Sequence, residues 1–128
     1  MSFNRRFSGD PNTMKLEHEN YSAELVENHT VRLSGTFRLQ GKEHYLEIMS
    51  LLENAIKLAD GSLTIDLTDL NFLNSSGISS LSIFIIQARE AGHKKIRIIG
   101  SDKHSWQAKS LKNFQKLWKQ IEVEVRSV

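Results

Sequence analysis

The sequence contains no cysteine and a single proline, Pro11, in 128 residues. Without cysteine the chain can form no disulfide and support no thiol catalysis, and a metal site would have to rely on histidine and carboxylates. No apolar run approaches the roughly 20 residues that a membrane-spanning helix needs, and no secretory signal is visible. These absences predict a cytoplasmic protein that does not insert into a membrane.

The net charge is also small, because 17 Lys and Arg residues are nearly balanced by 15 Asp and Glu residues. Proteins that bind nucleic acid usually carry a concentrated basic patch, and we interpret the lysines between Lys103 and Lys119 as a solvated helix face. The five histidines form no pair at helical spacing, and no glycine-rich phosphate-binding motif occurs. We therefore expect no metal, no cofactor and no direct contact with nucleic acid.

The length and the hydrophobic content of 39% fit one globular domain with a substantial core. Residues 1–15 contain the only proline and lack apolar periodicity, which predicts a flexible N-terminal arm. Residues 16–128 are predicted to form the single domain.

Apolar periodicity predicts an alternation of strands and helices within this domain. Two short strands at Tyr21–Val26 and 30–33 should pair as an antiparallel hairpin. The later segments alternate, with strands predicted at 62–68, 95–99 and 123–125 and helices at 45–59, 74–92 and 111–121. This order predicts an α/β fold: an open mixed sheet with mostly parallel central strands, an N-terminal antiparallel hairpin and packed helices.

The motif Asn74-Ser75-Ser76-Gly77 stands between a predicted strand and the most apolar predicted helix. Asn and Ser are preferred at helix N-caps, but one cap would suffice, so three such residues in a row suggest a further role. A helix N-terminus also favours negative charge, so a phosphate on Ser75 or Ser76 would be well placed. Because sites in open α/β sheets lie at the carboxyl ends of the strands, we expect partners to meet the protein here.

Around this motif the chain resembles the STAS family, the sulfate transporter and anti-sigma factor antagonist domains. The resemblance rests on the strand 62–68, on Asn74-Ser75-Ser76-Gly77 followed by Leu81, and on the turn Glu90-Ala91-Gly92, and it extends loosely over residues 21–125. It implies a non-catalytic regulator of the anti-sigma factor antagonist type. The implied partner is an anti-sigma factor or a related ATP-binding serine kinase, which would phosphorylate the serine that falls on Ser75.

One face of the predicted second long helix extends the predicted contact surface. At 3.6 residues per turn, Leu81, Phe84 and Ile85 share the side expected to pack on the sheet, together with Ile78, Ala88 and Ala91. The opposite side is predicted to contact a partner, although a neighbouring helix or a homodimer would also cover it. The complete predicted partner-binding set is Asn74, Ser75, Ser76, Gly77, Ser79, Ser82, Ile83 and Ile86.

Two alternatives follow from the motif itself. The STAS family usually has Asp where this chain has Asn74, which is compatible with a constitutive scaffold or a transporter-associated subunit that is not phosphorylated. A serine hydrolase is the more distant alternative, because the motif lacks the first glycine of Gly-x-Ser-x-Gly. Since Asp and Asn cap helices about equally well, the sequence predicts that Asn74→Asp hardly changes stability.

Overall fold

The computed structural model describes residues 5–6 and 14–128. Most of the predicted arm over residues 1–15 therefore lies outside the described residues, and its flexibility stays a prediction. Within it, Arg5–Arg6 form strand β1, and Lys15 begins strand β2, Lys15–Glu17. Met14, next to β2, is buried, so the packed domain begins at or before this residue.

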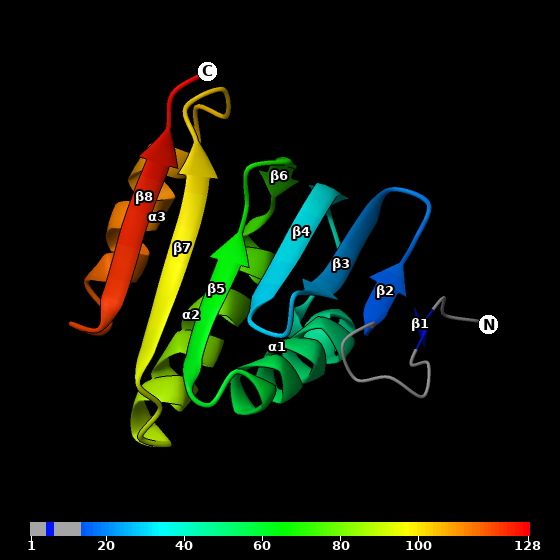
Figure 1. Cartoon of the computed structure of the whole chain (residues 1–128). Coiled ribbons are helices and arrows are strands. Elements are labelled where there is room, and N and C mark those ends of the chain that lie inside the picture. The colour runs from blue at the N-terminus through cyan, green and yellow to red at the C-terminus, as the bar shows by residue number, and fades with distance from the viewer. Residues whose placement is uncertain (1–4, 7–13) are drawn as a thin grey trace.

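The described chain forms an eight-stranded sheet in the order β1-β2-β3-β4-β5-β7-β8, with β6 paired to β4 (Figure 1). The pairings β1–β2, β2–β3 and β3–β4 are antiparallel, whereas β4–β5, β4–β6, β5–β7 and β7–β8 are parallel. The predicted mixed α/β sheet with its N-terminal hairpin is thus confirmed. The remaining strands are β3, Tyr21–Val26; β4, Thr30–Phe37; β5, Ser62–Asp66; β6, Leu70–Leu73; β7, Lys95–Ser101; and β8, Ile121–Arg126.

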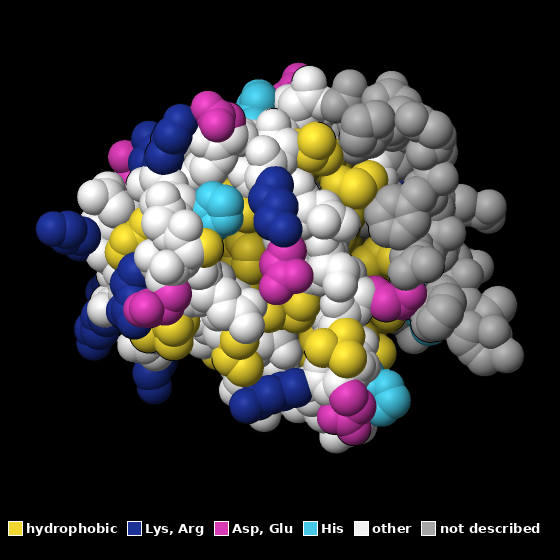
Figure 2. Space-filling model, turned by 90° about the horizontal axis from the view of Figure 1, so that it is seen from below, with side chains coloured by type: hydrophobic (Ala, Val, Ile, Leu, Met, Phe, Trp, Pro, Cys, Tyr) yellow, Lys and Arg dark blue, Asp and Glu magenta, His cyan; other side chains and the backbone are white. Residues whose placement is uncertain are grey.

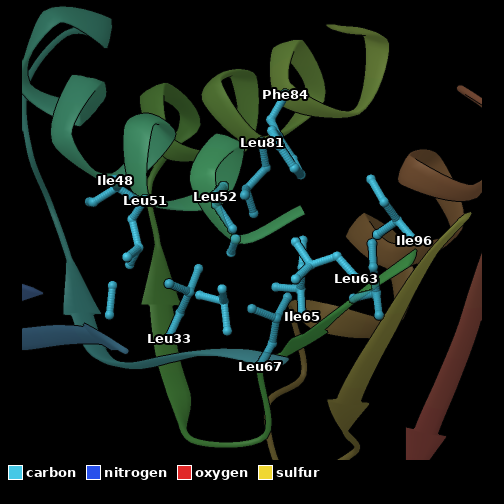
Figure 3. Packing of buried hydrophobic residues seen from close by; sticks show 14 of the residues in the cluster. Leu33, Ile48, Leu51, Leu52, Leu63, Ile65, Leu67, Leu81, Phe84 and Ile96 are labelled. Atoms are coloured by element: carbon cyan, nitrogen blue, oxygen red, sulfur yellow. The ribbon is translucent and has the colours of Figure 1, made fainter. Parts of the chain in front are cut away.

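All of the long helices lie on one face of this sheet (Figure 1). They are α1, Leu46–Leu58; α2, Ser75–Glu90; and α3, Gln107–Gln115, and a short 3-10 helix, η2, Lys42–Tyr45, precedes α1. Alternate residues of the central strands point to the helices and are buried, as Figure 3 shows for Leu33, Leu63 and Ile65. None of the described helices is long and apolar enough to cross a bilayer.

The predicted sheet-facing side of α2 is confirmed over most of its length. Leu81, Phe84, Ile85 and Ala88 are at most 5% exposed and belong to the main core, and Figure 3 shows Leu81 and Phe84 directed toward the sheet. Two predicted members lie at the margin, since Ile78 is half-buried and Ala91 is exposed. The core therefore holds α2 in place from its first turn to its last.

The predicted C-terminal helix over 111–121 is wrong at both ends, because α3 spans Gln107–Gln115. Helix α3 ends at Gln115, the N–H of Leu117 then donates to the Phe114 carbonyl in a tight turn, and Ile121 begins β8. Trp118 is still buried, but it packs from the turn rather than from the helix. Ile121 lies beside Ile96 in the parallel β7–β8 pair, a long-range contact that helical periodicity does not reveal.

Strand β6, Leu70–Leu73, has no counterpart among the strands predicted from the sequence. In the structure β6 continues the sheet beside β4, with a register shift between Gly35 and Thr36. This short strand ends just before α2 and so positions the start of that helix.

The surface seen from below in Figure 2 intermixes Lys and Arg side chains with Asp and Glu side chains. Some of these charges form exposed ion pairs, such as Lys94 with Asp60 at 3.0 Å. Over the coloured part of this face, no single sign of charge dominates.

Candidate functional site

The predicted contact motif lies at the start of α2, at the edge where the parallel strands β4, β5 and β7 end (Figure 1). The N–H of Asn74 donates to the carbonyl of Phe37 at the end of β4, so β6 and β4 place this residue together. Asn74 is the N-cap of α2: its backbone is extended, and its Oδ1 accepts from the N–H of Gly77 at 3.0 Å. The predicted capping role of the motif is therefore filled by Asn74.

Asn74 also ties α2 to the segment between β4 and α1. Its Oδ1 accepts a second hydrogen bond, from the Tyr45 hydroxyl at 2.7 Å. Its Nδ2 donates to the carbonyl of Leu39 at 2.8 Å. Both ends of the amide are thus used, and the Nδ2 bond requires a donor that an aspartate at this position would not have.

The two serines of the motif have different surroundings. Ser75 is the first residue of α2 and is exposed, and its hydroxyl makes no hydrogen bond within the described part of the chain. Ser76 is half-buried, and its Oγ accepts from the N–H of Gly41 at 3.2 Å. Gly41 has a φ of 90°, a conformation that favours glycine. Only Ser75 therefore presents an unengaged hydroxyl to solvent.

Gly77 is buried beneath the motif rather than displayed on it. A Cβ at this position would lie 2.2 Å from Cδ1 of Leu73 and 2.8 Å from the hydroxyl oxygen of Tyr45. The absence of a side chain thus lets the first turn of α2 pack against β6 and η2. The sequence pattern placed Gly77 in the contact motif, and the geometry gives it this internal packing role.

Tyr45 connects the motif to a row of aromatic side chains. The Tyr45 ring stacks with the Phe37 ring. The Phe37 ring also contacts the Tyr21 ring, and these two ring centroids are 4.4 Å apart. Burial raises the pKa of the Tyr45 phenol to about 12, so the hydroxyl stays protonated and donates to Asn74. The apolar periodicity over residues 45–59 predicts a helix that includes Tyr45, but it gives no sign of this polar role.

Gln107 fixes the loop that leads from β5 to β6. Its fully buried side chain donates from Nε2 to the carbonyls of Leu67 and Leu70, and its Oε1 accepts from the N–H of Ser101. One amide thus joins α3, the end of β7 and the approach to α2. No spacing or motif in the sequence distinguishes this glutamine from a surface residue.

Asp66, at the end of β5, stabilises the same loop. Its Oδ1 accepts from both the N–H and the hydroxyl of Thr68, and Arg32 lies 3.5 Å from its Oδ2. Burial alone would raise the pKa of Asp66, but these hydrogen bonds and the Arg32 charge outweigh it and lower the pKa below its ordinary value of 3.8. The ionised form of Asp66 is therefore the form that the fold favours.

We expect Asp66→Asn to lower the free energy of unfolding by about 1–2 kcal/mol at neutral pH, since hydrogen bonds to a charged acceptor are worth about 1.5–3 kcal/mol and Asn retains part of them. Because the pKa of Asp66 is depressed on folding, its contribution is complete above the unfolded pKa and is lost as the pH falls through the folded value. Urea unfolding at stepped pH should show the deficit of the variant shrinking below about pH 4.

The matched control for this prediction is Asp69→Asn in the same loop. Asp69 is exposed and lies 3.6 Å from Lys103, a surface ion pair of little value. A deficit for Asp66→Asn that is constant with pH would contradict the assignment.

The predicted outer face of α2 continues from the exposed serine along the helix. Ser79 and Ile83 are half-buried, and Ile86 is 36% exposed. Ser82 is half-buried too, and its hydroxyl donates to the carbonyl of Ile78 within the helix. The structure brings this stripe and Ser75 onto one helix, but whether a partner contacts them stays a prediction.

The surroundings of the two serines offer no support for hydrolase chemistry. An activated serine needs a general base within hydrogen-bond reach. Among the described residues, no histidine is hydrogen-bonded to Ser75 or Ser76, and the Nε2 of His104 lies 3.0 Å from the carbonyl oxygen of Thr68. The arrangement presents a hydroxyl at a helix N-terminus without assembling a nucleophile.

No protein-family model matches this chain, and no curated protein matches it. Its structure is similar to SiaC of Pseudomonas aeruginosa, with a TM-score of 0.62 and 15% sequence identity over all of both chains. It is also similar to a chain in the crystal structure of the diguanylate cyclase SiaD in complex with its activator SiaC, from the same organism, with a TM-score of 0.64 and 14% identity over 88% of this chain and 95% of that one. This protein therefore shares its fold with SiaC.

Proposed function

We propose that this protein is a non-catalytic regulator that binds a partner protein through Ser75 and the outer face of α2, and that phosphorylation of Ser75 switches the binding. The proposal depends mainly on the different hydrogen bonding of the three polar residues in the motif. Asn74 caps the helix and the Ser76 hydroxyl accepts from Gly41, whereas the Ser75 hydroxyl is exposed and has no hydrogen bond to any described residue. An exposed hydroxyl is what a kinase requires of an acceptor.

The electrostatic setting of Ser75 supports a switch by phosphate. Phosphorylation adds a charge of about −1.5 to −2, and the free amides and positive dipole end at the start of α2 favour that charge in the folded protein. The same charge would change the potential of a partner-binding surface that carries no acidic residue in its first helical turn. Phosphorylation would thus leave the domain folded and break the complex.

The partner classes come from two similarities. The STAS resemblance implies an ATP-binding serine kinase of the anti-sigma factor type as the modifying partner. SiaC is described as the activator of a diguanylate cyclase, so we propose an enzyme of that class as the regulated partner, in preference to a transcription factor. A constitutive scaffold or transporter-associated role is the alternative if Ser75 is never modified.

The test compares Ser75→Ala and Ser75→Asp as baits in affinity capture from the native cell extract. We expect the Ala variant to retain a partner of the diguanylate cyclase class and the Asp variant to bind it at least tenfold more weakly, a loss of about 1.4 kcal/mol. Intact mass after incubation with ATP and extract should show one phosphate on the parent and none on Ser75→Ala.

The matched control is Ser50→Asp, which adds the same charge at an exposed serine of α1. Equal capture by the Ala and Asp variants, with no phosphate on Ser75, would refute the switch and favour a constitutive scaffold.

A further inference from the structure

The motif presents two adjacent serines to any modifying enzyme, yet the structure treats them differently. Ser75 and Ser76 follow one another at the start of α2, so the positive dipole end of the helix acts on both. Ser75 is exposed and Ser76 is half-buried, and of the two hydroxyls it is that of Ser76 that contacts the segment between β4 and α1. That segment is therefore where a difference in reactivity between the two hydroxyls would arise.

The segment 39–45 contacts the start of α2 at three points. The carbonyl of Leu39 accepts from Asn74 Nδ2, the N–H of Gly41 donates to Ser76 Oγ, and the Tyr45 hydroxyl donates to Asn74 Oδ1. All three distances lie between 2.7 and 3.2 Å. The two bonds to Asn74 hold the segment in position. In this position the N–H of Gly41 donates to the hydroxyl of Ser76 and not to that of Ser75.

We propose that segment 39–45 is a latch that confines modification of this motif to Ser75. The latch engages the Ser76 hydroxyl and leaves the Ser75 hydroxyl in solvent, so an incoming enzyme meets one acceptor rather than two. Asn74 is the positioning residue of the latch, because it holds Leu39 and Tyr45 without touching either serine hydroxyl. This inference deepens the proposed function and rests on it for its biological meaning, but its physical content is independent of any kinase.

A second feature indicates that the latch is built to a fixed geometry. Gly41 has a φ of 90°, a backbone conformation that residues with a side chain rarely adopt. Tyr45 is only 2% exposed and anchors the other end of the segment in the core. The N–H that reaches Ser76 is thus carried by a tight turn with a buried anchor, rather than by a free loop.

The test uses cysteine as a reporter, because the chain has none of its own. Ser75→Cys and Ser76→Cys are prepared separately, and their second-order rates of alkylation by iodoacetamide are measured on the folded protein. We expect Cys at position 75 to react at least tenfold faster than Cys at position 76. In denaturant, where no latch exists, the two rates should become nearly equal.

Releasing the latch should then raise the rate at position 76 selectively. Asn74→Ser keeps an N-cap oxygen for Gly77, but it removes the bond to Leu39 and is too short to reach Tyr45. Combined with Ser76→Cys, it should raise the alkylation rate severalfold, while Tyr21→Phe, which removes a phenol outside the latch, should not. Thermal unfolding of each variant separates local release from global destabilisation.

Two results would overturn the latch: equal rates at positions 75 and 76 in the folded protein, or a rate ratio that Asn74→Ser leaves unchanged while the domain stays folded. Either result leaves the capture experiment on Ser75 untouched. Conversely, a confirmed rate ratio with no phosphate on Ser75 would retain the latch and remove its proposed biological purpose.

Discussion

Replacing Leu81 by Asp is expected to abolish cooperative folding. Leu81 is 5% exposed and points from α2 into the core between the helices and the sheet (Figure 3). A carboxylate forced into such surroundings loses its hydration and costs several kcal/mol, which is comparable with the roughly 5–15 kcal/mol stability of a whole domain. Thermal unfolding followed by far-UV circular dichroism should show no transition for this variant, or one shifted down by tens of degrees.

The matched control is Ile86→Asp, which places the same charge on the same helix. Ile86 is 36% exposed on the outer face, so its carboxylate stays hydrated and the transition should move little. Partner binding should fall in this variant, because the charge lies in the predicted contact stripe. Ile83 is half-buried, which makes Ile86 the cleaner probe. Loss of the transition in Ile86→Asp would assign this face to the core instead of to a partner.

The contrast between Leu81 and Ile86 could be predicted from the sequence because both residues belong to one regular helix. Burial on a helix follows a 3.6-residue period, and that period is visible in the order of the apolar residues. The alternation of strands and helices was visible for the same reason. Periodicity is a local property, so it predicts elements and their faces well.

What the sequence could not provide were contacts between distant segments. Strand β6 exists because β4 accepts it as a neighbour, and the end of α3 is set by the pairing of Ile121 with Ile96. The Tyr45 hydroxyl bonds to a residue 29 positions away, and Nε2 of Gln107 bonds to residues 37 and 40 positions away. Nothing in the neighbouring sequence marks a polar side chain whose partners lie at that separation.

Asn74 gives the sharpest example of this limit. As a helix cap it is equivalent to Asp, and from the sequence alone the exchange should be neutral. The structure revises that expectation, because Nδ2 donates to the Leu39 carbonyl at 2.8 Å. An aspartate would place a second oxygen against that carbonyl and leave it without its donor. The asparagine at position 74 therefore has a structural reason in this chain.

We accordingly expect Asn74→Asp to lower the free energy of unfolding by about 2 kcal/mol at neutral pH. Leaving a buried acceptor without its donor costs about 1–3 kcal/mol, and the Leu39 carbonyl is partly buried. The helix dipole favours the new carboxylate by only about 0.3–1 kcal/mol at this position. The loss therefore exceeds the gain, and urea unfolding of parent and variant at neutral pH measures the difference.

Acid should reverse this loss, which distinguishes it from a general packing defect. A protonated Asp at position 74 can donate to the Leu39 carbonyl while its other oxygen accepts from Gly77 and Tyr45, as the amide does. The fold then prefers the neutral form, so the pKa of this carboxyl is raised on folding. The loss in the free energy of unfolding is therefore present at neutral pH and disappears as the pH falls through that raised pKa. Asp66 titrates in parent and variant alike and cancels in their difference. A deficit that stays constant from neutral pH to about pH 4 would show that the Leu39 bond is not its cause.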